Sequence, residues 1–339
     1  MRVWEVQDAW GIEHLRMSNR PEPALPRPGE VTIRMRAAAI NYRDLATVLN
    51  SAPFGRLPQI PLSDGAGEVI AVGEGVTRVR SGDRVCTNFF LDWPDGAPTA
   101  ANRRRARGSA EVPGVLQELI VSDSEAVSLA PASLHWTEAA TLPCAALTAW
   151  RALMIEGRLN AGDTVVVQGT GGVSIFALQF AKSRGATVIA TSSSDAKLER
   201  ARALGADHVI NYANTPEWGK SVLELTGGRG ADHIVEVGGA GTINQSLVAA
   251  AVNGIILMIG VLGGRSQELL IPAVFGKNLH LTGISVGSRA HFEQMSEAIE
   301  RARLKPVVDQ VYPFSNVPEA FRAMAQRGHF GKICIDFDT

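Results

Sequence analysis

The sequence predicts a two-domain α/β protein, in which a mostly β domain is joined to a doubly wound parallel sheet. Three observations lead to this prediction. The chain has 339 residues, more than a single hydrophobic core usually supports. From Met1 to about Ser124 it consists of short β-rich runs separated by proline and glycine. From Asp163 onward similar runs alternate with helical patterns.

The N-terminal part is predicted to form a compact set of strands. Its β-rich runs are VTIRMRAAAI after Pro28-Gly29, then AGEVIAVG, DRVCTNFF and LQELIVSD. Between Asp92 and Pro113 the chain shows no periodicity. Loops of this length without secondary structure are usually functional or mobile. The segment contains Arg103-Arg104-Arg105. These arginines either are solvated in the loop or attract an anionic group of the substrate.

The central part is predicted to form βαβ units, because strands separated by helices run parallel and are covered on both faces. The strand-like runs are TVVVQG, ATVIAT, DHVINY, DHIVEVG, GIILMIG and LHLTGIS. The helix-like segments are GVSIFALQFAKSRG, DAKLERARALG, one ending near Leu225 and one from about Ile243 to Ala251. Asn253-Gly254 is a turn signal that splits the most apolar window into a helix end and a strand.

After Gly287 the pattern predicts two further helices and two further strands. The helices are Ala290 to Leu304 and Pro318 to Arg327, and the strands are VVDQVYPF and KICIDF.

A glycine-rich turn follows the first strand of the parallel sheet and opens a helix. In VVVQGTGGVS the candidate cofactor-binding residues are Gly169, Thr170, Gly171, Gly172 and Val173. The first glycine permits a tight turn, and the next lets the backbone approach a pyrophosphate at the helix N-terminus. Ser174 occupies the third position of the fingerprint, where glycine or alanine is usual. A tight connection without a ligand is the alternative.

The end of the second strand, ATVIATSSSDAK, favours NADP(H) over NAD(H). NAD-binding sites usually place a carboxylate there for the ribose 2′-hydroxyl, and this sequence has Ser192. Asp195 comes later, in the expected first turn of a helix. Lys197 is then available for a 2′-phosphate, with hydroxyls from Ser192 and Ser193. The alternative is that the serines cap the helix and Lys197 is solvated.

Composition narrows the possible partners. Lys and Arg number 33 and Asp and Glu 34, so no net field draws the chain to nucleic acid or to an anionic membrane. The N-terminus MRVWEVQDAW has no signal-peptide pattern, no segment is predicted to span a membrane, and three cysteines are too few for a disulfide framework. We expect a cytoplasmic protein that acts on small molecules.

Many short motifs together resemble the medium-chain dehydrogenase/reductase superfamily, and within it the zinc-independent quinone oxidoreductase branch. They are Pro28-Gly29-Glu30-Val31, Asn41-Tyr42-Arg43-Asp44, Asp64-Gly65-Ala66-Gly67-Glu68-Val69, Val72-Gly73, Gly82-Asp83-Arg84-Val85, Leu142-Pro143, Thr148-Ala149-Trp150, the glycine turn, Leu204-Gly205-Ala206-Asp207, Ile210-Asn211-Tyr212 and Gly331-Lys332. The resemblance covers essentially the whole chain. It implies a GroES-like catalytic domain of residues 1–126 and 288–339 and a Rossmann domain of residues 127–287, with cofactor and substrate in a cleft between the domains.

The resemblance also implies further cofactor contacts. Tyr212 would assist Lys197 at the 2′-phosphate. Two segments would lie along the nicotinamide, and these are Gly260, Val261 and Leu262, and Ser285, Val286 and Gly287. By the same resemblance Thr148 and Lys332 are cofactor-binding candidates.

A catalytic zinc is not expected. In zinc-dependent relatives three side chains hold the metal. The resemblance places Asn41 at the first ligand position, Ser63-Asp64 at a His-Glu pair and Cys144 at the third. One thiolate cannot form a three-ligand site, and the structural-zinc cysteines are absent from the sequence. Cys144 is also explained as a small buried residue.

Direct hydride transfer from NADPH is the chemistry expected without zinc, with a quinone or an α,β-unsaturated carbonyl as the acceptor. By resemblance Asn41 and Asp44 line the pocket. The Asn41 amide and nearby backbone N–H groups would donate to the developing enolate oxygen. Tyr42 or solvent would supply a proton. Residues 41–44 are also explained as a helix start alone.

Two other functions remain open from the sequence. One is a zinc-independent, NADP-dependent alcohol/aldehyde oxidoreductase, and the other is a dinucleotide-binding sensor without turnover. A homodimer is expected in either case. The strand LHLTGIS, Leu279 to Ser285, ends the parallel sheet and would otherwise leave an open apolar edge.

Overall fold

Two compact units make up the chain in the computed structural model, which describes residues 1–50 and 55–338. One unit consists of Met1–Leu147 and Val286–Thr339, and the other of Thr148–Ser285. The first border lies later in the chain than the predicted one after residue 126. The reason is that residues following 126 pair with the first unit, where strand β7 (Val127–Leu129) is antiparallel to β5 (Arg84–Thr87).

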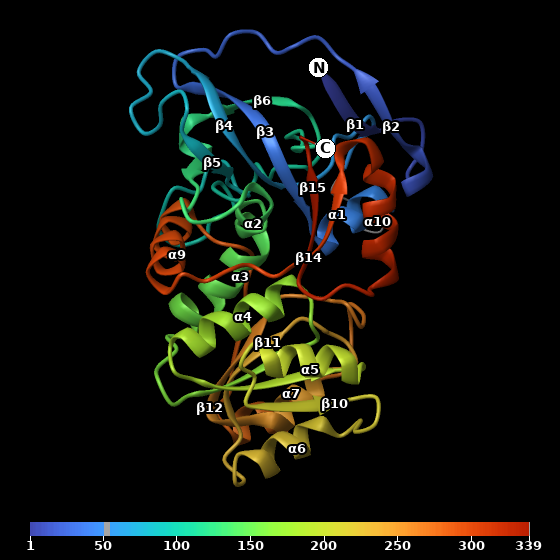
Figure 1. Ribbon diagram of the computed structural model, residues 1–339. Helices are drawn as coiled ribbons and strands as arrows, with labels where there is room; N and C mark the ends of the chain where they lie inside the picture. The colour runs from blue at the N-terminus through green and yellow to red at the C-terminus, as the bar shows by residue number, and fades with distance from the viewer. Residues whose placement is uncertain (51–54, 339) are drawn as a thin grey trace. The chain divides into compact units, whose positions relative to one another are not determined.

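A seven-stranded sheet forms the centre of the first unit, in the order β14-β15-β3-β4-β5-β7, with β6 paired to β3 (Figure 1). The remaining strands of this sheet are β3 (Glu30–Ile40), β4 (Asp64–Val72), β6 (Leu119–Asp123), β14 (Val308–Pro313) and β15 (Lys332–Asp336). The four β-rich runs and the two C-terminal strands predicted from the sequence are therefore confirmed.

The pairing of β3 with β15 joins the N-terminal and C-terminal parts of the first unit. These strands are antiparallel, and Ile333 lies opposite Ile40. Lys332 at the start of β15 is thereby placed beside the end of β3, where Asn41 follows. This register brings Lys332 next to Asn41.

The helices of the first unit are short except for two near the C-terminus. They are α1 (Tyr42–Val48), α2 (Trp136–Ala139), α9 (Arg289–Ala302) and α10 (Val317–Gln326), with a π-helical segment at Leu142–Ala146. The helix α10 packs Phe321 into the core of the sheet. An antiparallel hairpin of β1 (Arg2–Val6) and β2 (Leu15–Asn19) was not predicted.

The segment from Asp92 to Pro113 has neither a named helix nor a named strand, as its lack of periodicity predicts. It is nevertheless anchored by buried side chains. Trp93 is fully buried, and its indole N–H donates to the Gly96 carbonyl at 3.0 Å. Arg105 pairs with Asp92 at 2.9 Å, so at least one of the three consecutive arginines takes part in the loop's own structure.

The second unit contains a six-stranded parallel sheet in the order β10-β9-β8-β11-β12-β13. Its strands are β8 (Thr164–Gln168), β9 (Thr187–Ser192), β10 (His208–Asn211), β11 (Ala231–Glu236), β12 (Ala250–Met258) and β13 (His280–Gly283). The chain starts at β8 in the middle and proceeds first to one side and then to the other. The point where this order reverses lies between β8 and β11, and ligands of open α/β sheets bind at such a point.

Helices cover this sheet on both faces, as the doubly wound prediction requires. The helices of this unit are α4 (Gly172–Ser183), α5 (Asp195–Ala203), α6 (Trp218–Leu225), α7 (Ile243–Ala249) and α8 (Ile271–Gly276). The helix α3 (Leu147–Trp150) lies at the first border between the units and is followed by a π-helical segment at Arg151–Glu156. Val166 and Ile234 share a core with Trp218 of α6 and Leu247 of α7. Successive strand residues point to opposite faces, so Val165 and Val167 face the other side.

Two differences from the sequence-based elements appear in this unit. The helix α7 ends at Ala249, and Ala250 and Ala251 already belong to β12, which turns at Asn253 with a positive φ of 62°. The short helix α8 was not predicted at all.

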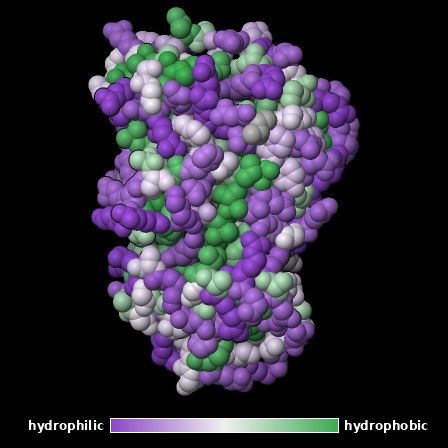
Figure 2. Space-filling view, in the orientation of Figure 1, coloured by the Kyte–Doolittle hydropathy of each residue, from purple (hydrophilic) through white to green (hydrophobic). Residues whose placement is uncertain are grey.

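Hydrophilic residues cover most of the face shown in Figure 2, and hydrophobic ones form separate patches. Throughout residues 1–50 and 55–338, every helix is too short or too polar to cross a membrane.

Candidate functional site

The glycine turn leaves an open cradle of backbone at the end of β8. Gly169 has a φ of 69°, in the left-handed region, and Gly171 is the N-cap of α4. A Cβ built on either glycine would meet nothing within 4 Å. The first N–H groups of α4 have no side chain to cap them, because the capping residue is glycine. This geometry fits a pyrophosphate at the helix N-terminus.

Ser174, at the third fingerprint position, has a structural role of its own. Its hydroxyl is buried and donates to the Gln168 carbonyl at 2.6 Å. The serine therefore ties the first turn of α4 to the end of β8, which is the close helix–strand approach that glycine or alanine usually permits. Thr170 is buried in the same turn, and Val173 is half-buried.

The predicted 2′-phosphate residues lie at the ends of β9 and β10. The Tyr212 N–H donates to the Ser192 carbonyl at 3.0 Å, so these two residues are neighbours. Ser193 is exposed, and Lys197 is half-buried in the first turn of α5. Tyr212 is 42% exposed. The residues predicted to bind the 2′-phosphate therefore lie together at the edge of the parallel sheet that β9 and β10 form.

Part of the same segment caps α5, as the alternative explanation requires. The Ser194 hydroxyl is the N-cap and accepts from the Lys197 N–H at 3.4 Å, while Ser192 accepts from the Ser194 N–H. Asp195 in the first turn accepts from the Asn211 amide at 2.7 Å. This capping uses the backbone N–H of Lys197 and not its ammonium group.

A second glycine turn lies at the end of β11, next to the switch point. Glu236 is buried and accepts hydrogen bonds from the N–H groups of Gly238 and Gly239, both at 2.9 Å. It also accepts from Gln168 at 2.7 Å and from hydroxyls of Thr242 and Ser246. One carboxylate thereby holds the turn after β11 against the strand that carries the glycine cradle.

One predicted nicotinamide segment lies in the second unit, and the other, Ser285 to Gly287, spans the border at which the chain returns to the first unit. Gly260 packs against Val237, where an added Cβ would approach the carbonyl oxygen to 2.3 Å. Val261 and Leu262 are 46% and 40% exposed. Ser285 ends the second unit, and its carbonyl accepts from Arg151 at 3.3 Å.

Three other cofactor candidates lie at the unit borders. Thr148 is buried at the first border. Val286 begins the returning part of the first unit with a φ of 48°, which is rare for a β-branched residue. Gly287 packs against Leu147, where an added Cβ would lie 3.0 Å from the leucine side chain.

Two of the catalytic candidates, Asn41 and Asp44, belong to a buried polar cluster in the first unit. Asn41 is the N-cap of α1, and Asp44 accepts from the Asn41 N–H at 2.8 Å. Asp44 is also paired with Arg43 at 3.0 Å. Residues 41–44 therefore do start a helix, as the structural explanation predicts. Tyr42 is 40% exposed, with Arg327 over its ring.

Lys332 belongs to this cluster through its contacts. Its ammonium group donates to the Ile40 carbonyl and to the Asn41 amide oxygen, both at 2.6 Å. The residue is only 3% exposed. The structure thus places Lys332 beside the catalytic candidates, and its assignment to the cofactor stays a prediction.

Asp64 is a fully buried carboxyl in the same cluster. It accepts from the Ser63 hydroxyl at 2.6 Å and from the Cys144 N–H at 3.0 Å. Burial raises the pKa of Asp64 to about 6, with a further contribution from the charge of Asp44, although the charge of Lys332, the hydrogen bond from Ser63 and the nearby Asn41 amide act in the opposite direction. Burial also raises the pKa of the Cys144 thiol well above its usual range.

Asp64→Asn is expected to change stability in a pH-dependent way. Between about pH 4 and pH 6 the folded protein holds a proton on Asp64 that the unfolded chain releases, so this carboxyl weakens the folded state as the pH rises. The free energy of unfolding of the variant, minus that of wild type, should increase by roughly 2 kcal/mol from pH 4 to pH 8. Urea titrations at both pH values measure it. A difference that stays constant from pH 4 to pH 8 would contradict the raised pKa.

The residues at the zinc positions do not fit a catalytic zinc ion. The oxygen of Asn41 accepts from a lysine ammonium group, which would repel a metal cation. Both oxygens of Asp64 already accept hydrogen bonds. Within the part of the chain that the structure describes, no group of three or more His, Cys, Asp or Glu side chains is arranged to hold a metal.

Sequence reasoning missed the partners of these residues. Lys332 and Asn41 are 291 positions apart, and no local pattern connects them. Asp64 was named from the sequence as part of a family motif and as a replaced zinc ligand, without a hydrogen-bond partner. Glu236 had a usable signal, since this glutamate ends an apolar strand and is followed, after Val237, by Gly238-Gly239 at the carboxyl edge of a parallel sheet.

Comparisons with known proteins cover both units. A family model of the alcohol dehydrogenase GroES-like domain matches residues 27–132, and one of zinc-binding dehydrogenases matches residues 172–301. A zinc-type alcohol dehydrogenase-like protein of Schizosaccharomyces pombe is 42% identical over 335 residues, which cover 97% of this chain and 96% of that protein.

Two solved structures share the fold over nearly the full length. That of an NAD-dependent alcohol dehydrogenase is 34% identical, with a TM-score of 0.91, and the match covers 99% of this chain and 100% of that one. That of a mycobacterial quinone oxidoreductase is 26% identical, with a TM-score of 0.83 and coverage of 99% and 100%.

Proposed function

Since the chain belongs to the medium-chain dehydrogenase/reductase superfamily of oxidoreductases, we propose that it transfers hydride from NADPH to a quinone or an α,β-unsaturated carbonyl without a metal ion. The observation that carries the proposal is the Asn41 amide. Its nitrogen is buried and has no hydrogen-bond partner among residues 1–50 and 55–338. A buried donor without a partner destabilises the folded protein, because it has lost its hydrogen bonds to water. A substrate oxygen would accept the hydrogen bond that Nδ2 has available.

The cofactor is assigned from the open cradle at Gly169 and Gly171 and from the edge formed by β9 and β10. A pyrophosphate in the cradle places the adenosine ribose near the end of β9, where Ser192 stands instead of a carboxylate. Lys197 then serves the 2′-phosphate. The similar NAD-dependent alcohol dehydrogenase makes NADH the direct alternative. NADPH supplies the hydride once bound.

The reduction of an enone needs one hydride and one proton. The hydride forms a new C–H bond at the β-carbon, and the electrons of the double bond move to the carbonyl oxygen as an enolate. The Asn41 amide donates a hydrogen bond to that oxygen where negative charge develops. The enolate then takes a proton at the α-carbon, which restores the carbonyl. The exposed Tyr42 or solvent supplies this proton.

A substrate panel separates this function from its competitors. NADPH oxidation is measured with a quinone, an enone and a simple aldehyde. Faster turnover of the quinone or the enone supports the proposal. Preference for the aldehyde supports the alcohol/aldehyde oxidoreductase, because a simple aldehyde cannot delocalise the charge. Tight NADPH binding without turnover of any acceptor supports a dinucleotide-binding sensor.

Activity is expected to survive removal of metal ions, because the donor set around Asp64 does not fit zinc. The protein is dialysed against a chelator, its metal content is measured by elemental analysis, and its quinone or enone reduction is assayed. We expect unchanged kcat without stoichiometric metal. Zinc at one ion per chain, or activity that chelation removes and zinc restores, would show that a metal takes part.

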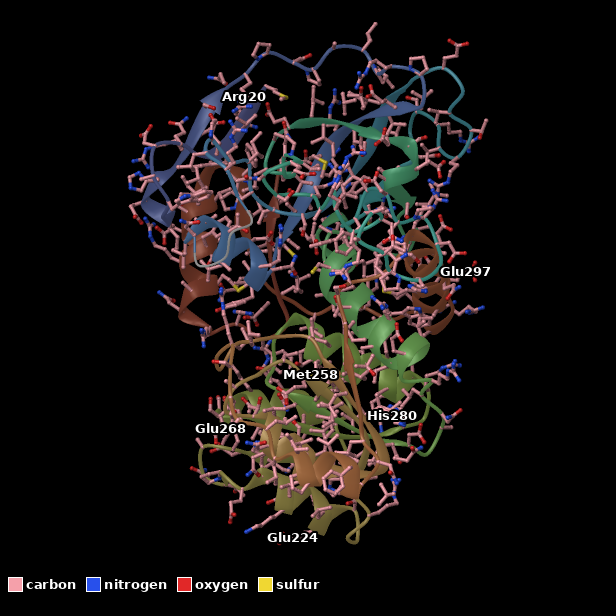
Figure 3. All side chains as sticks on the ribbon, turned by 180° about the vertical axis from the view of Figure 1, so that it is seen from behind. Arg20, Glu224, Met258, Glu268, His280 and Glu297 are labelled. Carbon is pink, nitrogen blue, oxygen red and sulfur yellow. The ribbon has the colours of Figure 1, made fainter. Side chains whose placement is uncertain are left out.

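A homodimer through β13 is also proposed. This strand is an edge of the parallel sheet, and Figure 3 labels His280 on it and Met258 on its neighbour β12. Exposed side chains nearby include Ile271 and Phe275 of α8, at 62% and 68% exposure. An apolar, unpaired edge favours association. Sedimentation velocity at micromolar concentration should show a dimer, and a monomer would refute this assignment.

The predicted cytoplasmic location stays a prediction.

A further inference from the structure

The contact between Lys332 and Asn41 determines how the Asn41 amide is turned. An ammonium group has three hydrogen atoms to donate and no acceptor. Its partner at 2.6 Å on Asn41 must therefore be the amide oxygen. The second bond of Lys332, to the Ile40 carbonyl at 2.6 Å, holds the ammonium group beside the end of β3.

Fixing the oxygen also fixes the nitrogen, because the amide group is planar and its NH2 points the other way. Asn41 is 7% exposed, and its Nδ2 has no hydrogen-bond partner in the described part of the chain. The carboxylate of Asp64 is close enough for the Asn41 amide to help lower its pKa. Its oxygens are nevertheless bonded to Ser63 and Cys144, and no hydrogen bond joins it to Nδ2.

We propose that Lys332 is a positioning residue, which orients the Asn41 amide so that Nδ2 donates to the oxygen of a carbonyl or quinone substrate. This inference rests on the proposed function. Lys332 acts through Asn41 and does not touch the substrate. Accepting from a cation also polarises the amide, which strengthens the hydrogen bond that Nδ2 donates. A neutral side chain thus delivers part of the effect of a positive charge to the developing oxyanion.

A double-mutant cycle tests whether Lys332 acts through Asn41. Lys332→Met keeps the length and removes the donor, and Lys332→Arg keeps a donor. We expect Lys332→Met to lower kcat for an enone by about 10- to 100-fold, with partial recovery in Lys332→Arg. In an Asn41→Ala background it should lower kcat by less than about 2-fold, because the group that it orients is gone. Full additivity would overturn the inference.

The affinity for NADPH separates this role from a direct cofactor contact. The Kd for NADPH is measured by fluorescence titration for wild type and Lys332→Met. We expect the two values to agree within about 2-fold. A weakened Kd with unchanged kcat would assign Lys332 to the cofactor and overturn its role toward Asn41.

Binding of 4-nitrophenolate gives a readout that does not need turnover, because its oxygen resembles an enolate oxygen. Wild type should bind it, and Lys332→Met should bind it at least about 10-fold more weakly at equal folded fraction. If wild type reduces enones while Lys332→Met keeps both kcat and phenolate binding, the inference fails and the proposed function stands. If wild type reduces no acceptor, the proposed function fails, and the dependence of phenolate binding on Lys332 alone decides the inference.

Asn41→Asp supplies the test should Lys332→Met fail to fold. Its carboxylate accepts from Lys332 on either oxygen and donates nothing. We expect a folded protein that has lost phenolate binding and most of kcat. Wild-type phenolate binding or wild-type kcat in this variant would overturn the inference.

Discussion

Asn41→Ala is expected to lower kcat for a quinone or an enone by about 100- to 1,000-fold, with little change in the Kd for NADPH. The variant removes the Asn41 amide, which follows the end of β3. Among residues 1–50 and 55–338, this amide is the only group of the buried cluster with an N–H that has no hydrogen-bond partner. A hydrogen bond to an oxyanion strengthens as negative charge develops. Its loss should therefore reduce kcat more than it raises the KM of the acceptor.

The measurement is steady-state kcat and KM for one quinone and one enone, with thermal unfolding to confirm that the variant is folded. Asn214→Ala is the matched control, because Asn214 is an exposed asparagine in the turn after β10. We expect wild-type kinetics from the control. A loss below about 5-fold in folded Asn41→Ala would mean that Asn41 is only the N-cap of α1, whose removal costs stability but not rate.

Ser192→Asp is expected to reverse the cofactor preference, and Lys197→Ala to weaken it. A charge-assisted contact to a phosphate contributes roughly 1.5–3 kcal/mol, which corresponds to about 10- to 150-fold in affinity. Lys197→Ala should lose about that factor for NADPH and leave NADH nearly unchanged. Ser192→Asp should lose more, because its carboxylate repels the 2′-phosphate while accepting from the 2′-hydroxyl of NADH.

The kcat/KM for NADPH and NADH, with one fixed quinone, measures both effects. Lys220→Ala is the control, since Lys220 is an exposed lysine of α6 paired with Glu217. Equal losses for both cofactors in Lys197→Ala would indicate that the TSSSDAK segment serves only to start α5. A wild type that prefers NADH would contradict the NADP assignment at once, and would agree with the similar NAD-dependent alcohol dehydrogenase.

Elements with strong local patterns were predictable from the sequence. The strands of the parallel sheet are continuous apolar runs between glycines and polar turns, and they appear where the pattern places them, except that β12 already begins at Ala250. The hairpin of β1 and β2 was missed because a longer connection with no tight-turn signal separates its strands. The helix α8 was missed because a six-residue helix that begins with Ile271-Pro272 has too little periodicity to detect.

The candidate site was predictable residue by residue but not as an arrangement. The glycine turn and the TSSSDAK segment are local, and their positions at the carboxyl ends of β8 and β9 follow from the βαβ pattern. The cluster around Asn41 depends on the antiparallel pairing of β3 with β15, which joins distant parts of the chain. Composition and spacing carry no information on that register, so the contact of Lys332 with Asn41 came only from the structure.

Transfer of deuterium from labelled NADPH tests the central claim most directly. The protein, freed of metal by dialysis, is mixed with NADPH deuterated at C4 of the nicotinamide and with a cyclic enone, and the product is analysed by NMR. Hydride transfer to a conjugated acceptor predicts the saturated ketone, with deuterium from one face of C4 at the β-carbon and a solvent-derived proton at the α-carbon. Deuterium at the carbonyl carbon of an alcohol product, or no transfer from either face, would contradict it.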